Sequence, residues 1–175
     1  ILALNANKKN QNVRLFDISR NYRNINNEVE QGEVPIQENI LTIGMYGENI
    51  DFYTLKGLIE NVLELSGVNR YEIEKETANA SYHPGRCANI KVGIDTVATI
   101  GEVHPEVLGN YKIEKRAYLA EVNITKLVKY SKKKKKYQEV PKFPAVERDI
   151  AIIVDESVEV GQIEKIIIKK AKKLL

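Results

Sequence analysis

The spacing of apolar residues changes along the chain, and each spacing predicts a type of element. Over residues 51–67, apolar side chains recur every three or four positions, which is the period of a helix with one buried face. Asp51 is placed to cap the N-terminus of this helix, and Gly67 can end it in a left-handed conformation. Gly57 lies inside the helix, and we expect the absence of its side chain to allow close contact with a sheet.

Six shorter segments have the composition of β-strands, because β-branched and aromatic residues are frequent in them and turn-forming residues flank them. They cover residues 13–22, 40–46, 71–77, 88–94, 97–103 and 116–122. Asp95 and Thr96 separate the fourth and fifth of these segments, so we expect a hairpin that turns there. Short helices are predicted over residues 105–110 and 124–129.

Both histidines of the chain precede a proline, which favours a role in turns. In the segment 82–86, the Pro-Gly pair presets the two central positions of a type II turn, and at 104–105 a proline suits the first position of a helix. We therefore assign structural turn roles to His83, Pro84, Gly85, Arg86, His104 and Pro105. An imidazole can also act as a general base, so a stand-alone enzyme that uses His83 or His104 is kept as an alternative hypothesis.

A run of five lysines marks a change in the chain's organisation. Like charges at this density repel one another and favour an extended, solvated linker, so we place a domain boundary here. Beyond it, residues 148–155 have the alternation of a strand, and residues 160–175 carry the apolar stripe of a helix. One strand and one helix cannot close a core, so the sequence predicts only part of a second domain.

Composition narrows the class of protein only slightly. The chain has 175 residues, 43% of them hydrophobic and 29% charged, and no apolar run approaches the ~20 residues of a membrane span. Its net charge is +3, but residues 129–175 contain 13 Lys or Arg against 7 Asp or Glu, and the preceding part is slightly acidic. Cys87 is the single cysteine, which excludes an internal disulfide, and we expect a small buried thiol.

Motifs for nucleotide binding are absent from the sequence. There is no Walker loop, no GxGxxG and no GxSxG, so phosphate binding by a glycine-rich loop has no support. The cations of the tail can instead contact a nucleic-acid backbone, because lysines release counterions when they neutralise phosphates. The candidates for this contact are Lys132, Lys133, Lys134, Lys135, Lys136, Lys142 and Arg148. A solvated linker that contacts no partner explains the lysine run equally well.

Five motifs, in their order along the chain, resemble those of one known family. They read VRLFDISRNY, DFYTLKGLIENVLELSG, YHPGRCANI, IGEVHPEVL and PKFPAVERDIAIIVDE. Together they resemble the C-terminal part of the bacterial phenylalanyl-tRNA synthetase beta subunit, over nearly the whole chain. The resemblance implies an α+β fold in which residues 1–130 form a non-catalytic class II synthetase-like core, an antiparallel sheet flanked by helices. It also implies a basic linker at 131–140 and the start of a ferredoxin-fold anticodon-binding domain, left incomplete, at 141–175.

The same resemblance bears on the chemistry. A class II active site holds ATP with arginines and with a glycine-rich third motif, because a triphosphate needs bidentate cations and a close backbone approach. In this chain the corresponding segment reads AYLAEVNITKL, without glycine or arginine. Arg14 and Arg20 flank the strand that resembles the second motif, and we interpret them as structural or interface residues. We therefore expect no catalytic residue, no metal ligand and no cofactor in this piece, while ATP and magnesium serve the whole enzyme.

The resemblance also implies partners. We expect a fragment of the non-catalytic beta subunit of phenylalanine-tRNA ligase, a cytoplasmic heterotetramer, that supports assembly with the alpha subunit and binding of tRNA(Phe), with no membrane partner. A paralogue that kept the core as an interaction module is a further alternative. Co-purification with an alpha-type subunit separates it from the first hypothesis.

Overall fold

A computed structural model describes residues 1–23, 35–131, 144, 146–155 and 157–171. The chain divides into two compact units, Ile1–Lys134 and Lys135–Leu175. The first unit contains the sheet and its core, and the second contains one helix among its described residues. The lysine run and Lys142 lie outside the described residues, so their predicted contact with nucleic acid stays a prediction.

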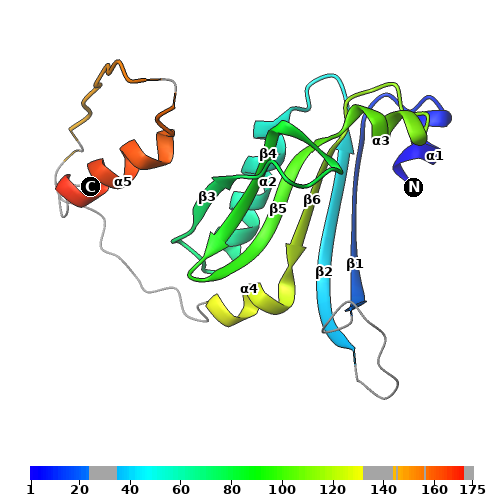
Figure 1. Cartoon of the computed structure of the whole chain (residues 1–175), viewed down its shortest axis with the longest axis horizontal. Coiled ribbons are helices and arrows are strands. Elements are labelled where there is room, and N and C mark those ends of the chain that lie inside the picture. The colour runs from blue at the N-terminus through cyan, green and yellow to red at the C-terminus, as the bar shows by residue number, and fades with distance from the viewer. Residues whose placement is uncertain (24–34, 132–143, 145, 156, 172–175) are drawn as a thin grey trace. The chain divides into compact units, whose positions relative to one another are not determined.

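The first unit is built on a six-stranded antiparallel sheet, as the resemblance implied. Its strands lie in the order β1-β2-β6-β5-β4-β3 (Figure 1). Their bounds are Val13–Arg23 (β1), Ile36–Tyr46 (β2), Glu72–Lys75 (β3), Tyr82–Val92 (β4), Asp95–Val103 (β5) and Tyr118–Asn123 (β6). Since consecutive strands are mostly neighbours and every pair is antiparallel, the α+β fold class is confirmed.

Helices α2 (Phe52–Leu65) and α4 (Ile124–Tyr130) cover one face of the sheet. On α2, Leu55, Ile59 and Leu63 are fully buried against inward-facing sheet residues such as Ile90 and Ile100. Full burial of one such side chain contributes roughly 1.5–3 kcal/mol to folding. Two shorter helices, α1 (Leu2–Asn7) and α3 (Pro105–Asn110), pack with a second apolar cluster around Tyr46 and Leu108.

Helix α2 begins and ends where the sequence predicted. Asp51 Oδ1 accepts a hydrogen bond from Thr54 N at 2.7 Å, and Asp51 N donates back to Thr54 Oγ1 at 3.4 Å. This reciprocal capping box lowers the pKa of the Asp51 carboxyl, mainly through the hydrogen bonds from Thr54. Gly67 follows the helix with φ +77°, which confirms the left-handed ending. The expectation for Gly57 was wrong, because a Cβ placed there would meet nothing within 4 Å.

Two turn predictions were also wrong in their location. The β4–β5 hairpin turns at Gly93 and Ile94, since Val92 pairs with Asp95, and Gly93 takes φ +61° at the first central position. Residues 82–86 lie within strand β4 and do not form a separate type II turn. There the ladder passes from Tyr82–Val103 directly to Cys87–Gly101, so the segment is an irregular bulge of the strand.

In the second unit, α5 (Val160–Ala171) confirms the predicted tail helix over its described part. The strand predicted over residues 148–155 was wrong, because no described residue there belongs to a strand. A strand needs a neighbour to satisfy its backbone N–H and C=O groups, and alternation alone does not supply one. Asp155 instead accepts hydrogen bonds from Ser157 N at 2.9 Å and Ser157 Oγ at 2.7 Å, which lower the pKa of the Asp155 carboxyl.

Candidate functional site

Polar side chains form one continuous row across the sheet on the face opposite α2. Residues directly opposite each other on paired strands project to the same side, so the row follows from the pairing register. It runs from β1 to β3 through Asp17, Thr42, Glu121, Thr99, Asn89 and Glu74. Their sequence neighbours, such as Ile43, Ile90 and Ile100, point to the opposite face and belong to the core. We call these six residues the polar row.

Hydrogen bonds connect the β3 end of the polar row. Asn89 Nδ2 donates to Glu76 Oε2 at 2.5 Å, and Thr99 Oγ1 donates to Asn89 Oδ1 at 2.7 Å. Glu74 Oε2 lies 2.6 Å from Lys91 Nζ. Lys91 is two residues beyond Asn89 on β4 and therefore projects to the same face of the sheet. The hydrogen bonds to the Glu76 carboxylate, chiefly from the backbone at Ala78, lower its pKa and keep it ionised.

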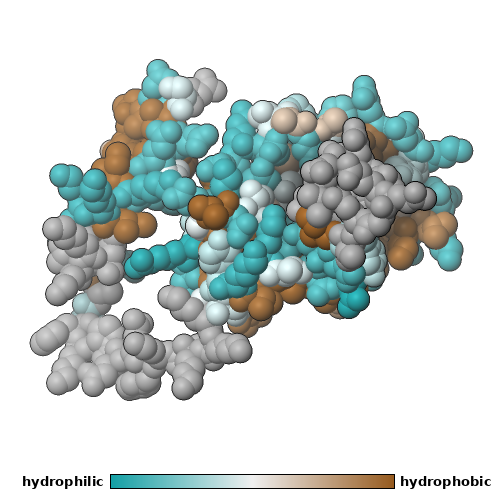
Figure 2. All heavy atoms as spheres, turned by 60° about the horizontal axis from the view of Figure 1, so that its bottom comes forward, coloured by the Kyte–Doolittle hydropathy of each residue, from teal (hydrophilic) through white to brown (hydrophobic). Residues whose placement is uncertain are grey.

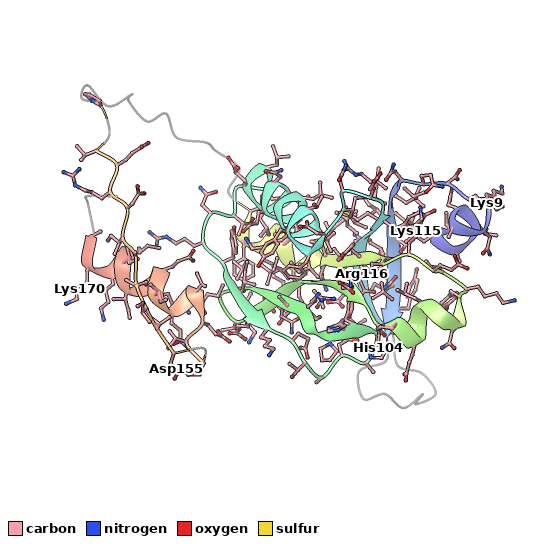
Figure 3. All side chains as sticks on the ribbon, turned by 90° about the horizontal axis from the view of Figure 1, so that it is seen from above. Lys9, His104, Lys115, Arg116, Asp155 and Lys170 are labelled. Atoms are coloured by element: carbon pink, nitrogen blue, oxygen red, sulfur yellow. The ribbon has the colours of Figure 1, made fainter. Side chains whose placement is uncertain are left out.

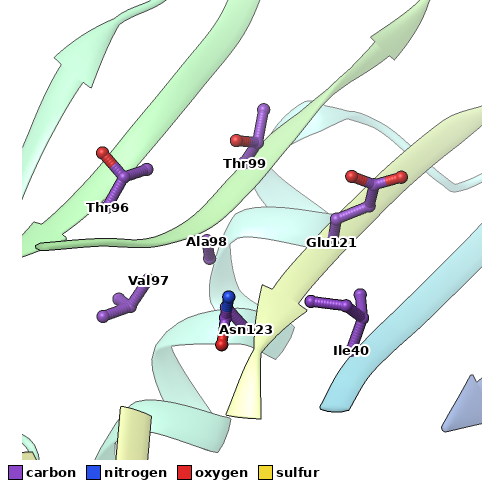
Figure 4. Close-up of a pocket in the computed structure, with 7 residues that line it drawn as sticks. All are labelled: Ile40, Thr96, Val97, Ala98, Thr99, Glu121 and Asn123. Carbon is purple, nitrogen blue, oxygen red and sulfur yellow. The ribbon is translucent and has the colours of Figure 1, made fainter. Parts of the chain in front are cut away.

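A shallow hollow of about 150 Å³ lies over the β5–β6 part of the polar row. Figure 4 shows Thr96, Thr99, Glu121 and Asn123 around it, with Ile40 from β2 at one side. Asn123 is already engaged, because its side chain accepts from Lys126 N at 2.9 Å and caps α4. Glu121 therefore supplies the charge of the hollow, and no cation lines it. Such a site suits hydrogen-bond donors and repels phosphate groups.

Two of the motifs that carry the family resemblance meet in an ion pair whose carboxylate is buried. Arg86 Nη1 lies 3.0 Å from both carboxylate oxygens of Glu102, whose side chain is only 5% exposed. Arg116 Nε is the second cation, 3.8 Å from Glu102 Oε1. Glu102 was not among the residues predicted from the sequence. The available signal was the single carboxylate within residues 97–103, which needs a partner when it is buried.

The two histidines do not form a catalytic site. His83 Nδ1 accepts from Gly85 N at 3.1 Å, and His104 Nδ1 accepts from Glu106 N at 3.3 Å at the start of α3. The carboxylate nearest His104, that of Glu106, is 3.9 Å away and its side chain is 88% exposed. Neither histidine lines the hollow over the polar row or the hollow near Lys9 and Lys115. A general base needs an orienting partner and a place for substrate, so the alternative of a stand-alone enzyme is not favoured.

Arg14 and Arg20 lie away from the polar row. They pair with Met45 and Asn39 on β2, and this register puts them on the helix-side face of β1. The polar row is on the other face, so these arginines do not converge with it on a ligand. This placement agrees with their interpretation as structural or interface residues.

Cys87 is buried, as expected for a small core thiol. Burial, together with the charge of Glu76, raises the pKa of the thiol to about 11, so the sulfur stays protonated near neutral pH. Across the described ranges, no group of His, Cys, Asp and Glu side chains is arranged to hold a metal ion. Within the same ranges, no helix is long and apolar enough to cross a membrane.

Of the residues proposed to contact tRNA, Arg148 is the one that the structure describes. It is exposed in the second unit, and its Nη1 donates to the carbonyl of Glu147 at 3.2 Å. Figure 2 shows hydrophilic residues over much of the visible surface, with hydrophobic residues in separate clusters. The structure therefore leaves the guanidinium of Arg148 accessible, and the other proposed contact residues lie outside the described residues.

Comparison with known proteins places the chain in a family. Residues 1–124 match the family described as "Phenylalanyl tRNA synthetase beta chain CLM domain". The chain belongs to this family. Phenylalanine–tRNA ligase beta subunits of Clostridium acetobutylicum and Clostridium tetani are 41% and 40% identical over 174 residues, 99% of this chain. The chain spans 22% of the length of each of these relatives.

Solved structures support the same fold. Two structures of pyrrolysyl-tRNA synthetase from Desulfitobacterium hafniense superpose with TM-scores of 0.55 and 0.54 and cover 72% and 68% of this chain. The matched regions make up 45% and 41% of those chains, and the sequence identities are 15% and 16%. At this identity the likeness concerns the fold alone: the six-stranded antiparallel sheet with its helices resembles the fold of these synthetases.

Proposed function

We propose that this chain is a non-catalytic part of the beta subunit of phenylalanine-tRNA ligase. In the whole enzyme it supports assembly with the alpha subunit and helps to hold tRNA(Phe), while the ATP-dependent charging reaction takes place elsewhere. Its site of action is the cytoplasm, and magnesium and ATP belong to the complete heterotetramer. Within the chain, residues 1–130 are the core, 131–140 a basic linker and 141–175 the start of an anticodon-binding domain.

The observation that carries this proposal is the charge of the polar row. Asp17, Glu74 and Glu121 contribute three carboxylates to the row, of which that of Glu74 is paired with Lys91, and none of the six residues of the row is cationic. A triphosphate bound there would be in contact with carboxylates, and like charges repel most strongly at short distance. The residues of this face do not fit ATP, and AYLAEVNITKL offers neither a glycine cradle nor an arginine.

Two assays test the proposal. The purified chain should catalyse no phenylalanine-dependent exchange between ATP and pyrophosphate, and exchange above a no-protein control would overturn the non-catalytic role. Co-expressed with a phenylalanine–tRNA ligase alpha subunit, the chain should co-purify with it. Absence of the complex, with the chain folded by circular dichroism, contradicts the assembly role and favours the paralogue hypothesis.

The tail makes a separate contribution through charge. We expect substitution of all five residues Lys132 to Lys136 by glutamine to weaken tRNA binding and to reduce its dependence on salt. Lys142→Gln and Arg148→Gln test the two remaining candidate residues, since each removes one charge outside the run. Equal affinity of the wild type and the five-glutamine variant would leave the lysine run as a linker without contact to tRNA.

A further inference from the structure

A second hollow of about 390 Å³ lies between two connections that are far apart in the sequence. One connection joins α1 to β1 and the other joins α3 to β6. Lys9 comes from the first, and Lys112 and Lys115 come from the second, against the single carboxylate of Glu114. Figure 3 shows Lys9 and Lys115 at the same end of the sheet unit. The remaining polar lining consists of side-chain amides, which carry no charge.

Two of these lysines have an unusual backbone. Lys9 has φ 60° and Lys112 has φ 55°, and they are the two non-glycine residues with positive φ in the described parts of the chain. Each follows the end of a helix, where its N–H donates back to Ala6 O at 2.9 Å or to Gly109 O at 3.0 Å. Glycine is usual at such positions, because a side chain strains the left-handed conformation. Both strained lysines thus line one hollow, although glycine would fit each backbone better.

The third lysine has a fixed position. Lys115 Nζ donates to Gln11 Oε1 at 2.6 Å and to Gln11 O at 3.2 Å, and it lies 5.8 Å from the centre of the Tyr46 ring. These hydrogen bonds join the α3–β6 connection to the α1–β1 connection, although the two residues are 104 positions apart in the sequence. They use two of the three N–H donors of the ammonium group, so one donor remains for a ligand.

We propose that this hollow binds a phosphate group, with Lys9, Lys112 and Lys115 as its cations. Three ammonium groups against one carboxylate give the lining a net positive charge, and lysine binds phosphate as a compact point charge. The lining residues are largely exposed, so a polymer backbone can lie across the hollow. The proposed function supplies tRNA as the source of the phosphate, and in this respect the inference rests on it. The polar row, on the acidic sheet face, is a separate surface.

The left-handed lysines allow a variant that removes charge without straining the fold. In the double variant Lys9→Gly and Lys112→Gly, glycine adopts the observed φ more easily than lysine does. We therefore expect its urea midpoint to equal or exceed that of the wild type. The matched control, Lys75→Gln with Lys126→Gln, removes two charges from β3 and α4 of the same unit, away from the hollow.

The test measures binding of the 175-residue chain to fluorescently labelled unfractionated tRNA at several KCl concentrations. For the glycine double variant, we expect weaker binding and a slope of log affinity against log salt that is reduced by about 1–2, since each lost phosphate contact changes it by about 0.9. The control variant should keep the wild-type slope. Equal slopes for the wild type and both variants would exclude tRNA as the source of the phosphate.

A second arm distinguishes tRNA from a free anion. Pyrophosphate alone should raise the urea midpoint of the wild type but not of the glycine variant if the hollow takes a free anion. If tRNA binding depends on the lysines and pyrophosphate has no effect, a polymer backbone is the source. No difference between the variants in either arm overturns the inference. Co-purification of the wild-type chain with the alpha subunit is measured without these variants, so failure of the phosphate site is distinguishable from failure of the proposed function.

Discussion

Replacing Arg86 by methionine tests how strongly the buried ion pair stabilises the sheet unit. Methionine keeps an unbranched apolar stem and removes the guanidinium, so the Glu102 carboxylate loses the cation at 3.0 Å from both its oxygens. Removing one partner of a fully buried pair destabilises a protein by about 3–5 kcal/mol. Here the Arg86 side chain is 43% exposed, and Arg116 remains 3.8 Å from the carboxylate, so screening and compensation reduce the effect. We expect a loss of about 2–3 kcal/mol in the free energy of unfolding.

A double-mutant cycle isolates the interaction between the two residues. Glu102→Gln keeps the shape of the side chain and removes its charge, at a cost of about 1–2 kcal/mol. In the double variant no buried charge is left without a partner. We therefore expect its destabilisation to be smaller than the sum of the two single effects by at least about 1 kcal/mol.

Urea unfolding followed by circular dichroism measures these differences, because the chain contains no tryptophan for fluorescence. Lys56→Met is the control: Lys56 Nζ lies only 2.6 Å from Glu60 Oε1, but both side chains are about 30% exposed on α2. The carboxylate of Glu60 is much less buried than that of Glu102, so this pair should contribute at most about 0.5 kcal/mol. Additive effects of Arg86→Met and Glu102→Gln, within about 0.5 kcal/mol, would refute the argument that burial makes this pair important.

Three other predictions concern stability and thiol chemistry. Gly57→Ala should raise the free energy of unfolding by about 0.5–1 kcal/mol, since the added Cβ meets no atom within 4 Å. Gly101→Ala should lower the free energy of unfolding, because the added Cβ would lie 2.6 Å from a ring carbon of Tyr82. Urea unfolding of both variants checks these opposite signs. Cys87, with its pKa raised to about 11, should react with a thiol reagent at pH 8 far more slowly in the folded chain than in urea, and equal rates would contradict its burial. The ordinary pKa of 9.0 is lower, so the unfolded chain loses this proton first, and stability should fall between pH 9 and 11 more steeply than in Cys87→Ala.

Local patterns in the sequence predicted the elements whose signals lie within a few residues. The helical spacing, the cap at Asp51 and the glycine at position 67 together define α2, and the proline at 105 defines the start of α3. Where a prediction needed a partner strand, it was less successful. The hairpin turn was misplaced by two residues, and the tail strand did not form, because pairing register and hydrogen-bond partners are not local properties.

The sequence by itself determined the family, the sheet-and-helix composition of the core and the absence of a glycine-rich phosphate loop, because each can be recognised from short motifs and from their order along the chain. Only the tertiary structure aligned one residue from each of six strands into the polar row. It also joined Arg86 to Glu102 and brought Lys9 beside Lys112 and Lys115. Charges separated by 16 to more than 100 positions act together only when folding sets their distance and burial, and those two quantities decide the strength of an electrostatic interaction.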